Sequence, residues 1–304
     1  MATFTYIDLF AGIGGFHQAA KELGGKCLFA SEIDPASCQA YFENYRLAPQ
    51  GDVTKIHVGD IPEHDILFAG FPCQPFSIIG SMKGFQDARG TLFFEISRIL
   101  EAKKPPLFML ENVKQLSTHD RGKTLNAILQ ILEFIGYKVY WRVLNALDFG
   151  LPQKRERTII VGFLDHSANF DFPVPAGAGS LSDILEPEET VDEKHFASEQ
   201  IVSKRLAKHT SKFYPAIWHE NKAGNVSSYP YSCALRAGAS YNYLLVNGKR
   251  RLTPREMLRL QGFPDTFKIV CTDSQTRKQA GNAVPVNMAK SVLQEVLAAW
   301  KALA

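Results

Sequence analysis

Short apolar runs alternate with helix-like segments through the first half of the chain. The runs have the length and composition of strands and occupy residues 4–10, 27–31, 66–69, 107–110, 138–144 and 158–163. Segments with helical periodicity lie near residues 16–23, 92–100 and 124–134. Because strands alternating with helices are typical of crossover-connected parallel sheets, we predict an α/β fold with a doubly wound, mostly parallel sheet.

The pattern changes after about residue 164. Periodicity is poor up to about residue 250, where turns rich in Pro, Gly and Ser predict a smaller, irregular domain. Regular structure returns at Thr253, where Pro254 and Glu256 complete a helix-capping pattern, and a last apolar stripe predicts a helix ending near Trp300. We therefore divide the chain into residues 1–171, a second domain at 172–262, and a return to the first domain at 263–304.

Composition narrows the class of protein without choosing a function. The 304 residues carry a net charge of +3, which neither demands nor excludes a nucleic-acid partner. The five cysteines include no C-x-x-C pair, which argues against a disulfide framework or a zinc site, and we expect no metal. No apolar run approaches a membrane span of roughly 18 residues, and the N-terminus does not have the form of a signal peptide. We expect a soluble, intracellular protein without a membrane partner.

A glycine-rich turn follows the first predicted strand. Its spacing is Gly12-Ile13-Gly14-Gly15, which fits a dinucleotide-binding G-x-G-x-x-G poorly but lets a ligand approach the backbone at a helix N-terminus. Glu32 follows the second strand, where a carboxylate can grasp ribose hydroxyls. A tight turn with a surface acid is the alternative interpretation.

Two further candidates also follow predicted strands. Residues 70–77 read Gly-Phe-Pro-Cys-Gln-Pro-Phe-Ser, which places Cys73 on a turn between two prolines. Glu111 ends another strand. Because the carboxyl ends of parallel strands meet at one edge of the sheet, we expect Glu32, Cys73 and Glu111 to converge there. Taken singly, Cys73 could be a packed loop cysteine and Glu111 a salt-bridged acid.

Residues 153–157 read Gln-Lys-Arg-Glu-Arg before a strand. If they are extended, Gln153, Arg155 and Arg157 share one face, which could grip a base or a phosphate. A solvated charged strand is the alternative.

Taken in order, these segments resemble the DNA (cytosine-5)-methyltransferases, bacterial type, of restriction–modification systems. The similar segments are residues 8–16, 70–77, 111–113, 153–157, 251–264 and 279–285, so the resemblance covers nearly all of the chain outside about 165–250. It implies the fold of S-adenosylmethionine-dependent methyltransferases, with a target-recognition domain at 172–262. A duplex hides the target carbon, so the cytosine must be flipped out.

The resemblance also implies roles for the candidate residues. Cys73 would attack C6 of the cytosine, so that C5 can accept the methyl group of S-adenosyl-L-methionine. Glu111 would bind N3 and the exocyclic amine, and Arg155 and Arg157 would hold the base. The segment 78–90 would close over the base as a mobile loop, its alternative being an ordinary surface loop. The implied cofactor contacts are Phe10, Gly12, Gly14, Glu32, Ile33, Asp60, Ile61 and Asn282.

DNA recognition should belong to the irregular domain. Basic residues there suit phosphates, and aromatic or amide groups suit base edges. The basic set is Lys194, Lys204, Arg205, Lys208 and Lys212, and the base-reading set is Tyr229, Tyr231, Arg236, Tyr241, Asn242 and Tyr243. A solvated basic face is the usual alternative, and the target sequence does not follow from these residues.

Three rival functions fit the sequence less well. An RNA methyltransferase of the related tRNA-modifying branch lacks support, because the Cys-Phe-Thr tripeptide associated with it is absent. A catalytically dead DNA-binding relative would not need Cys73 and Glu111, and a nicotinamide oxidoreductase would leave Cys73 without a role. The resemblance implies a cytoplasmic bacterial monomer that acts on double-stranded DNA at the nucleoid. A cognate restriction endonuclease would act separately.

Overall fold

The protein is described from a computed structural model that places residues 3–72 and 92–303. Two compact units result: the first is Met1–Leu144, Glu156–Val174 and Ala289–Ala304, and the second is Asn145–Arg155 and Pro175–Met288. The boundary near residue 174 lies close to the predicted one at 171. Residues 263–288, predicted to rejoin the first domain, group instead with the second unit.

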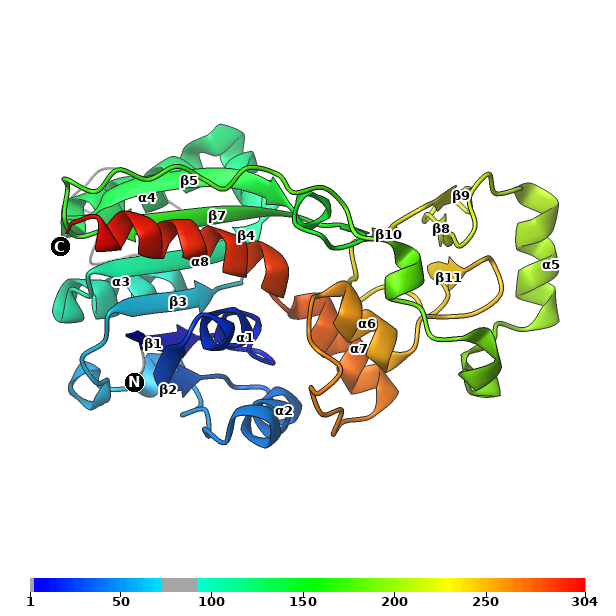
Figure 1. The fold of residues 1–304 in the computed structure, drawn as a ribbon, viewed down its shortest axis with the longest axis horizontal. Helices are drawn as coiled ribbons and strands as arrows, with labels where there is room; N and C mark the ends of the chain where they lie inside the picture. The colour runs from blue at the N-terminus through cyan, green and yellow to red at the C-terminus, as the bar shows by residue number, and fades with distance from the viewer. Residues whose placement is uncertain (1–2, 73–91, 304) are drawn as a thin grey trace. The chain divides into compact units, whose positions relative to one another are not determined.

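A six-stranded sheet forms the centre of the first unit, in the order β2-β1-β3-β4-β7-β5 (Figure 1). The strands are β1 (Phe4–Leu9), β2 (Gly25–Ser31), β3 (Ile66–Gly70), β4 (Leu107–Val113), β5 (Lys138–Asn145) and β7 (Glu156–Phe163). β1 pairs in parallel with β2 and β3, and β3 with β4, whereas β7 runs antiparallel to β4. The predicted mostly parallel α/β sheet is confirmed.

Helices cover both faces of this sheet, as the continuous apolar strands require. Ile7 and Leu9 of β1 share a core with α3 (Leu92–Lys103) and α4 (Lys123–Ile135). Alternate residues point the other way, toward α1 (Gly15–Glu22), whose Phe16 stacks on Phe68 of β3 at a centroid distance of 5.1 Å. The final helix α8 (Val286–Lys301) reaches the same side, where Lys290 pairs with Glu22.

One helix of this unit was not predicted from the sequence. α2 (Pro35–Tyr45) begins at Asp34, whose carboxylate accepts a hydrogen bond from the Ser37 amide, with Pro35 as the first helical residue. An acidic cap followed by proline is a helix-start signal that the sequence does contain. The α2 helix lacks a strong apolar stripe, so periodicity alone does not mark it.

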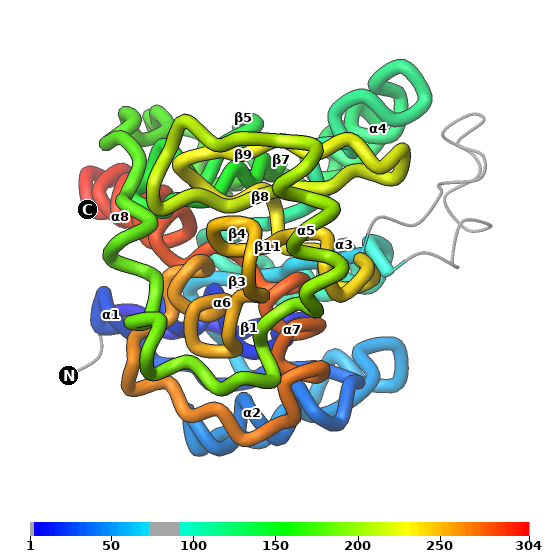
Figure 2. Tube along the Cα trace, turned by 90° about the vertical axis from the view of Figure 1, so that its right-hand side faces the viewer, coloured from blue at the N-terminus to red at the C-terminus, as the bar shows by residue number. Residues whose placement is uncertain are grey.

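The strands of the second unit are short. A three-stranded antiparallel sheet joins β11 (Leu244–Val246), β8 (Ile217–Glu220) and β9 (Val226–Tyr229). A second pairing joins β10 (Ser232–Cys233) in parallel to β6 (Gln153–Lys154). Figure 2 shows α5 (Glu199–Lys208) beside these strands and α6 (Pro254–Leu260) beside α7 (Asp273–Asn282). Thr253 caps α6 through the predicted capping box.

Candidate active site

The glycine turn between β1 and α1 adopts a conformation that its sequence favours. Gly12 and Gly14 have φ of 56° and 82°, in the left-handed region that glycine adopts without strain, and Phe10 shares it with φ of 54°. A Cβ on Gly14 would lie 2.4 Å from a ring carbon of Tyr45. Glycine is therefore required here both for backbone conformation and for space.

Glu32 organises this turn from the end of β2. Its Oε2 accepts a hydrogen bond from the Gly12 amide at 2.8 Å, and its Oε1 accepts from the amides of Ile33 and Asp34. A carboxylate offers about four acceptor sites, so three backbone bonds leave one for a ligand hydroxyl. The Glu32 carboxylate can thus fix the turn and still bind ribose.

The other predicted cofactor contacts differ in accessibility. Ile33 is 71% exposed, which is unusual for a large apolar side chain and suits an aromatic ligand face. Asp60 is exposed in the short helical turn Val58–Asp60. Ile61 is only 1% exposed and belongs to the core, so that it can offer a ligand its backbone rather than its side chain. Asn282 is exposed at the last residue of α7 in the second unit.

A buried polar cluster beneath the turn was not predicted. His17 Nδ1 lies 2.7 Å from the Tyr41 hydroxyl, and its ring stacks on Tyr45 at 3.8 Å. Burial, with a smaller effect of Lys21, lowers the pKa of His17 to about 3, so the imidazole is neutral at pH 7. The Tyr45 hydroxyl donates to the Gly14 carbonyl at 3.1 Å. The cluster therefore supports the turn from below.

Asp8 completes this cluster on β1. The side chain is 1% exposed, and burial, followed by the charge of Glu32, raises the pKa of its carboxyl well above the usual value. The residues of this cluster do not form a recognisable sequence motif. The one sign of the cluster in the sequence is that the polar residues Asp8 and His17 lie close to the glycine turn.

Glu111 and Arg157 form an ion pair in the first unit. Arg157 Nε lies 2.7 Å from Glu111 Oε1, and both side chains are largely buried. The next residue, Asn112, donates from Nδ2 to the Phe71 carbonyl at 2.9 Å. This bond fixes the chain two residues before Cys73. Cys73 itself and the predicted mobile loop at 78–90 lie outside the described residues.

Arg155 has a different environment from Arg157. Burial alternates over Gln153, Lys154 and Arg155, of which only Lys154 is exposed, whereas Glu156 and Arg157 are both half-buried. Arg155 Nη1 donates to the Leu235 carbonyl at 3.1 Å, and Nη2 donates to the carbonyls of Gly281 and Ala283 at 3.0 and 2.8 Å. All three acceptors are backbone groups of the second unit, a placement that favours a structural tie over a contact with the base.

The predicted DNA-binding residues fall into two groups. Lys204 and Arg236 are exposed, and Tyr241 is 50% exposed. Arg205 is 2% exposed, and its guanidinium pairs with Glu220 at 3.0 Å and also donates to the Asn242 carbonyl. Because this charge is already buried and compensated, Arg205 does not fit the phosphate contact predicted from the sequence.

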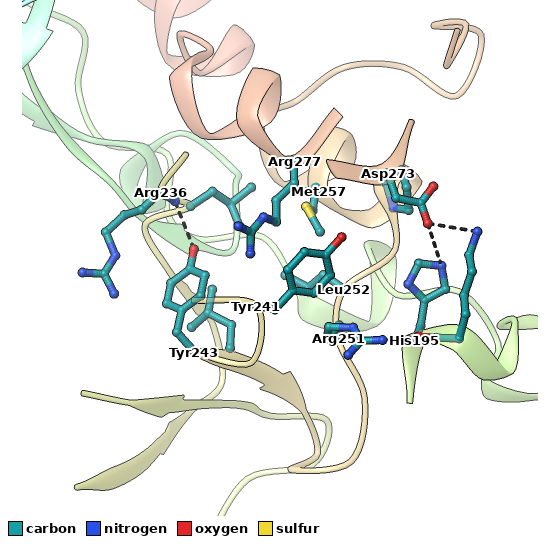
Figure 3. Close-up of a pocket in the computed structure, with 13 residues that line it drawn as sticks. His195, Arg236, Tyr241, Tyr243, Arg251, Leu252, Met257, Asp273 and Arg277 are labelled. Atoms are coloured by element: carbon teal, nitrogen blue, oxygen red, sulfur yellow. Dashed lines mark hydrogen bonds and ion pairs between the residues drawn. The ribbon is translucent and has the colours of Figure 1, made fainter. Parts of the chain in front are cut away.

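A pocket in the second unit gathers several of these side chains (Figure 3). Tyr241 lies between two guanidinium groups, those of Arg251 at 5.3 Å and Arg277 at 4.5 Å from the ring centroid. Arg251 also donates to Asn242 Oδ1 at 3.3 Å. Asp273 accepts from Lys194 at 2.9 Å and lies 3.7 Å from His195 Nε2. Cationic and aromatic groups thus predominate in this pocket.

Within residues 3–72 and 92–303, no group of three or more His, Cys, Asp or Glu side chains could hold a metal ion.

None of the helices in the described part of the chain is long and apolar enough to cross a membrane.

Comparison with known proteins gives the family. The family described as C-5 cytosine-specific DNA methylase matches residues 4–298. The type II methyltransferase M.HaeII of Haemophilus aegyptius is 55% identical over 294 residues, which cover 96% of this chain and 92% of that protein. M.HhaI of Haemophilus parahaemolyticus is 37% identical over 309 residues, covering 96% and 93%.

Solved structures agree on the fold. A mutant of the Spodoptera frugiperda DNMT2 superimposes with a TM-score of 0.75 at 20% identity and covers 97% of this chain and 100% of that one. The Dnmt2 methyltransferase of S. pombe gives a TM-score of 0.73 at 20% identity, with 97% and 98% covered. At this identity the likeness shows the fold alone. The sequence relatives show more: the chain belongs to the C-5 cytosine-specific DNA methylases and is a DNA cytosine-5 methyltransferase of the bacterial type II restriction–modification kind.

Proposed function

We propose that this methyltransferase moves a methyl group from S-adenosylmethionine to C5 of a cytosine flipped out of duplex DNA, through a covalent bond to Cys73. The observation that carries the proposal is the Glu111–Arg157 ion pair at 2.7 Å, next to the Asn112 bond that fixes the chain before Cys73. Activation of the base requires an oriented carboxylate that can assist protonation and a thiol nucleophile.

The residues of the glycine turn fit the cofactor. Glu32 keeps one acceptor site for a ribose hydroxyl, and exposed Ile33 offers an apolar surface to adenine. When bound, S-adenosylmethionine supplies the methyl group as an electrophilic carbon on a sulfonium. The proposed contacts are Phe10, Gly12, Gly14, Glu32, Ile33, Asp60, the backbone of Ile61, and Asn282.

The chain's own residues then carry the base chemistry. The Cys73 thiolate adds to C6, and the electron pair of the C5–C6 double bond becomes available at C5. Glu111 binds N3 and the exocyclic amine and assists protonation at N3, while Arg157 holds the Glu111 carboxyl in place. After C5 is methylated, a base removes the C5 proton, the double bond re-forms and the thiolate leaves.

Recognition of double-stranded DNA is assigned to the region 172–262. Its exposed candidates are Lys204, Arg236 and Tyr241, with Asn242 beside them, and Arg205 is left out because its charge is buried. We also propose that the enzyme acts as a cytoplasmic monomer and that any cognate restriction endonuclease is a separate protein.

Methyl transfer from labelled S-adenosylmethionine tests this proposal. The enzyme is incubated with mixed-sequence duplex DNA and, in parallel, with tRNA, and the DNA is sequenced for 5-methylcytosine. We expect label in DNA cytosines at one recurrent site. Label in RNA alone, or in neither substrate, would contradict it. Cys73→Ala should abolish methyl transfer, and Cys271→Ser, a change at the half-buried Cys271, is the control that should keep it.

A further inference from the structure

The backbone of Arg236 is hydrogen-bonded, whereas its side chain is exposed. The residue is exposed, and its amide donates to the Tyr243 hydroxyl at 3.0 Å. Its guanidinium lies over the Tyr243 ring, 4.8 Å from the centroid, and Tyr243 is only 7% exposed. The buried ring therefore forms a fixed platform beneath an exposed cation.

The other two pocket arginines are already engaged. Arg251 donates to Asn242 Oδ1 and to the Lys194 carbonyl, and Arg277 donates to the carbonyls of Ala239 and Ser240. Within the described residues, the Arg236 guanidinium has no hydrogen-bond acceptor and no carboxylate partner. Figure 3 shows it extending away from Arg251 and Arg277. Arg236 is thus the pocket arginine whose donors are open to a ligand.

The residue before Arg236 is clamped by two buried side chains. The Leu235 amide donates to Gln153 Oε1 at 3.0 Å, and the Leu235 carbonyl accepts from Arg155 Nη1 at 3.1 Å. Gln153 is 0% and Arg155 1% exposed. Gln153 also donates to the Leu260 carbonyl at the end of α6, and Arg155 donates to the Gly281 and Ala283 carbonyls at the C-terminal end of α7. Both main-chain groups of Leu235 are therefore tied to two helices.

The residue after Arg236 is confined as well. A Cβ added to Gly281 on α7 would lie 2.5 Å from the Ala237 backbone nitrogen and 3.0 Å from the Arg236 carbonyl carbon. Only glycine allows this close approach of α7 to the segment. The backbone on both sides of Arg236 is thus fixed before any ligand arrives.

We propose that Arg236 reads a guanine in the recognition site and that Arg155 is a positioning residue. Arg155 holds the segment Leu235–Ala237, called here the Arg236 segment, and does not touch the target cytosine. This inference rests on the proposed DNA specificity. The planar fork of arginine matches the O6 and N7 acceptors of guanine in the major groove. An arginine whose backbone is already fixed loses little conformational entropy when it binds a base, which favours base discrimination.

The proposed role of Arg236 is tested by measuring how strongly the enzyme discriminates against a changed base pair at each position of its site. The wild-type site is first mapped by sequencing 5-methylcytosine, and kcat/KM is then measured on duplexes that each change one base pair. Arg236→Ala should lower discrimination roughly 10- to 100-fold at one G·C pair and leave the other positions selective. Arg142→Ala is the matched control, because exposed Arg142 also lies over an aromatic ring, that of Phe172 at 5.0 Å.

Two other outcomes would overturn the reading of a guanine. An equal loss on every duplex, with a weaker salt dependence, would make Arg236 a phosphate contact. Unchanged discrimination would remove it from recognition. If the wild type methylates no DNA at all, the proposed function and this inference fail together. If the wild type methylates its site and Arg236→Ala gives either of the two outcomes above, only this inference fails.

Arg155→Lys tests the positioning role. Lysine keeps the charge but cannot present the planar fork to three carbonyls, so discrimination should fall at the same base pair, with no further loss when Arg236→Ala is added. The Cβ of Gly281→Ala would clash with the Ala237 backbone, so this variant should also lower discrimination at the same base pair. A lower kcat with discrimination retained at every pair would instead show that Arg155 serves the chemical step.

Discussion

At the scale of single residues, the site depends on pairs that strand register brings together. Val113 lies opposite Arg157 and Glu111 opposite Ile159 in the antiparallel β4–β7 ladder. Glu111 and Arg157 are therefore diagonal neighbours on one face, a separation that long side chains can bridge. The sequence predicted both residues individually, but their contact depends on β7 running antiparallel to β4, which the sequence does not show.

Glu111→Gln should reduce turnover by about 10²- to 10⁴-fold, because an amide cannot carry a proton to N3 of cytosine. Steady-state methyl transfer measures this loss. Glu156→Gln is the control, since Glu156 lies on the same strand β7 and pairs with the exposed Lys114 at 2.8 Å. Equal activity of Glu111→Gln and the control would remove Glu111 from the chemistry.

Tyr45→Phe should weaken cofactor binding by several-fold, because the glycine turn loses the hydroxyl that donates to the Gly14 carbonyl. One such hydrogen bond contributes about 1 kcal/mol. Titration with S-adenosylhomocysteine in a calorimeter gives the change. Tyr140→Phe removes a matched hydroxyl that donates to the Ala168 carbonyl at 3.1 Å, and its affinity should stay at the wild-type value. A Tyr45→Phe protein that binds equally well would show that the turn is held without this bond.

At the scale of elements, periodicity and caps decided what the sequence could predict. The six strands of the central sheet were predicted, and so were α1, α3, α4, α6 and α8, because each has an apolar pattern or a clear cap. The α5 helix was missed because its residues are mostly polar and charged, and its Arg205 was assigned to DNA although it points into the fold. Burial of a single cation depends on a partner, here Glu220, that lies elsewhere in the chain.

Two capping boxes in the second unit give a matched test at this scale. Thr253 caps α6 and is 6% exposed, together with a fully buried Glu256 that pairs with Arg250 at 2.8 Å. Thr272 caps α7 with Gln275 and is exposed. Thr253→Ala should lower the free energy of unfolding by more than Thr272→Ala, for which the loss of a cap costs about 1 kcal/mol. Denaturant unfolding measures both, and equal losses would contradict the importance of the buried network.

At the scale of the whole molecule, the two units correspond to two proposed tasks. The first holds Glu32, Glu111 and Arg157, and the second holds the pocket with Arg236 and Tyr241. Sequence reasoning placed residues 263–288 with the first domain, whereas they group with the second unit. Those residues include α7, which approaches the Arg236 segment closely at Gly281, a contact between segments far apart in sequence that no local pattern indicates.

Exchange of residues 172–250 for the matching region of a relative with another target site should transfer site preference. The expectation follows from the exposed candidates Lys204, Arg236 and Tyr241, all of which lie in that region. Sequencing of 5-methylcytosine in DNA treated with the chimera gives the answer. The wild-type preference retained by an active chimera would place recognition outside the exchanged region.

The covalent bond to Cys73 is the central claim, and a trapped complex tests it most directly. A duplex with 5-fluorocytosine at the mapped target has no C5 proton to lose, so the sulfur cannot be expelled after methyl transfer. We expect a complex that requires S-adenosylmethionine, resists denaturation, and yields by mass spectrometry a DNA-modified peptide containing Cys73, with none from Cys73→Ala. Methylation of ordinary DNA without such an adduct, or an adduct on another cysteine, would contradict the account.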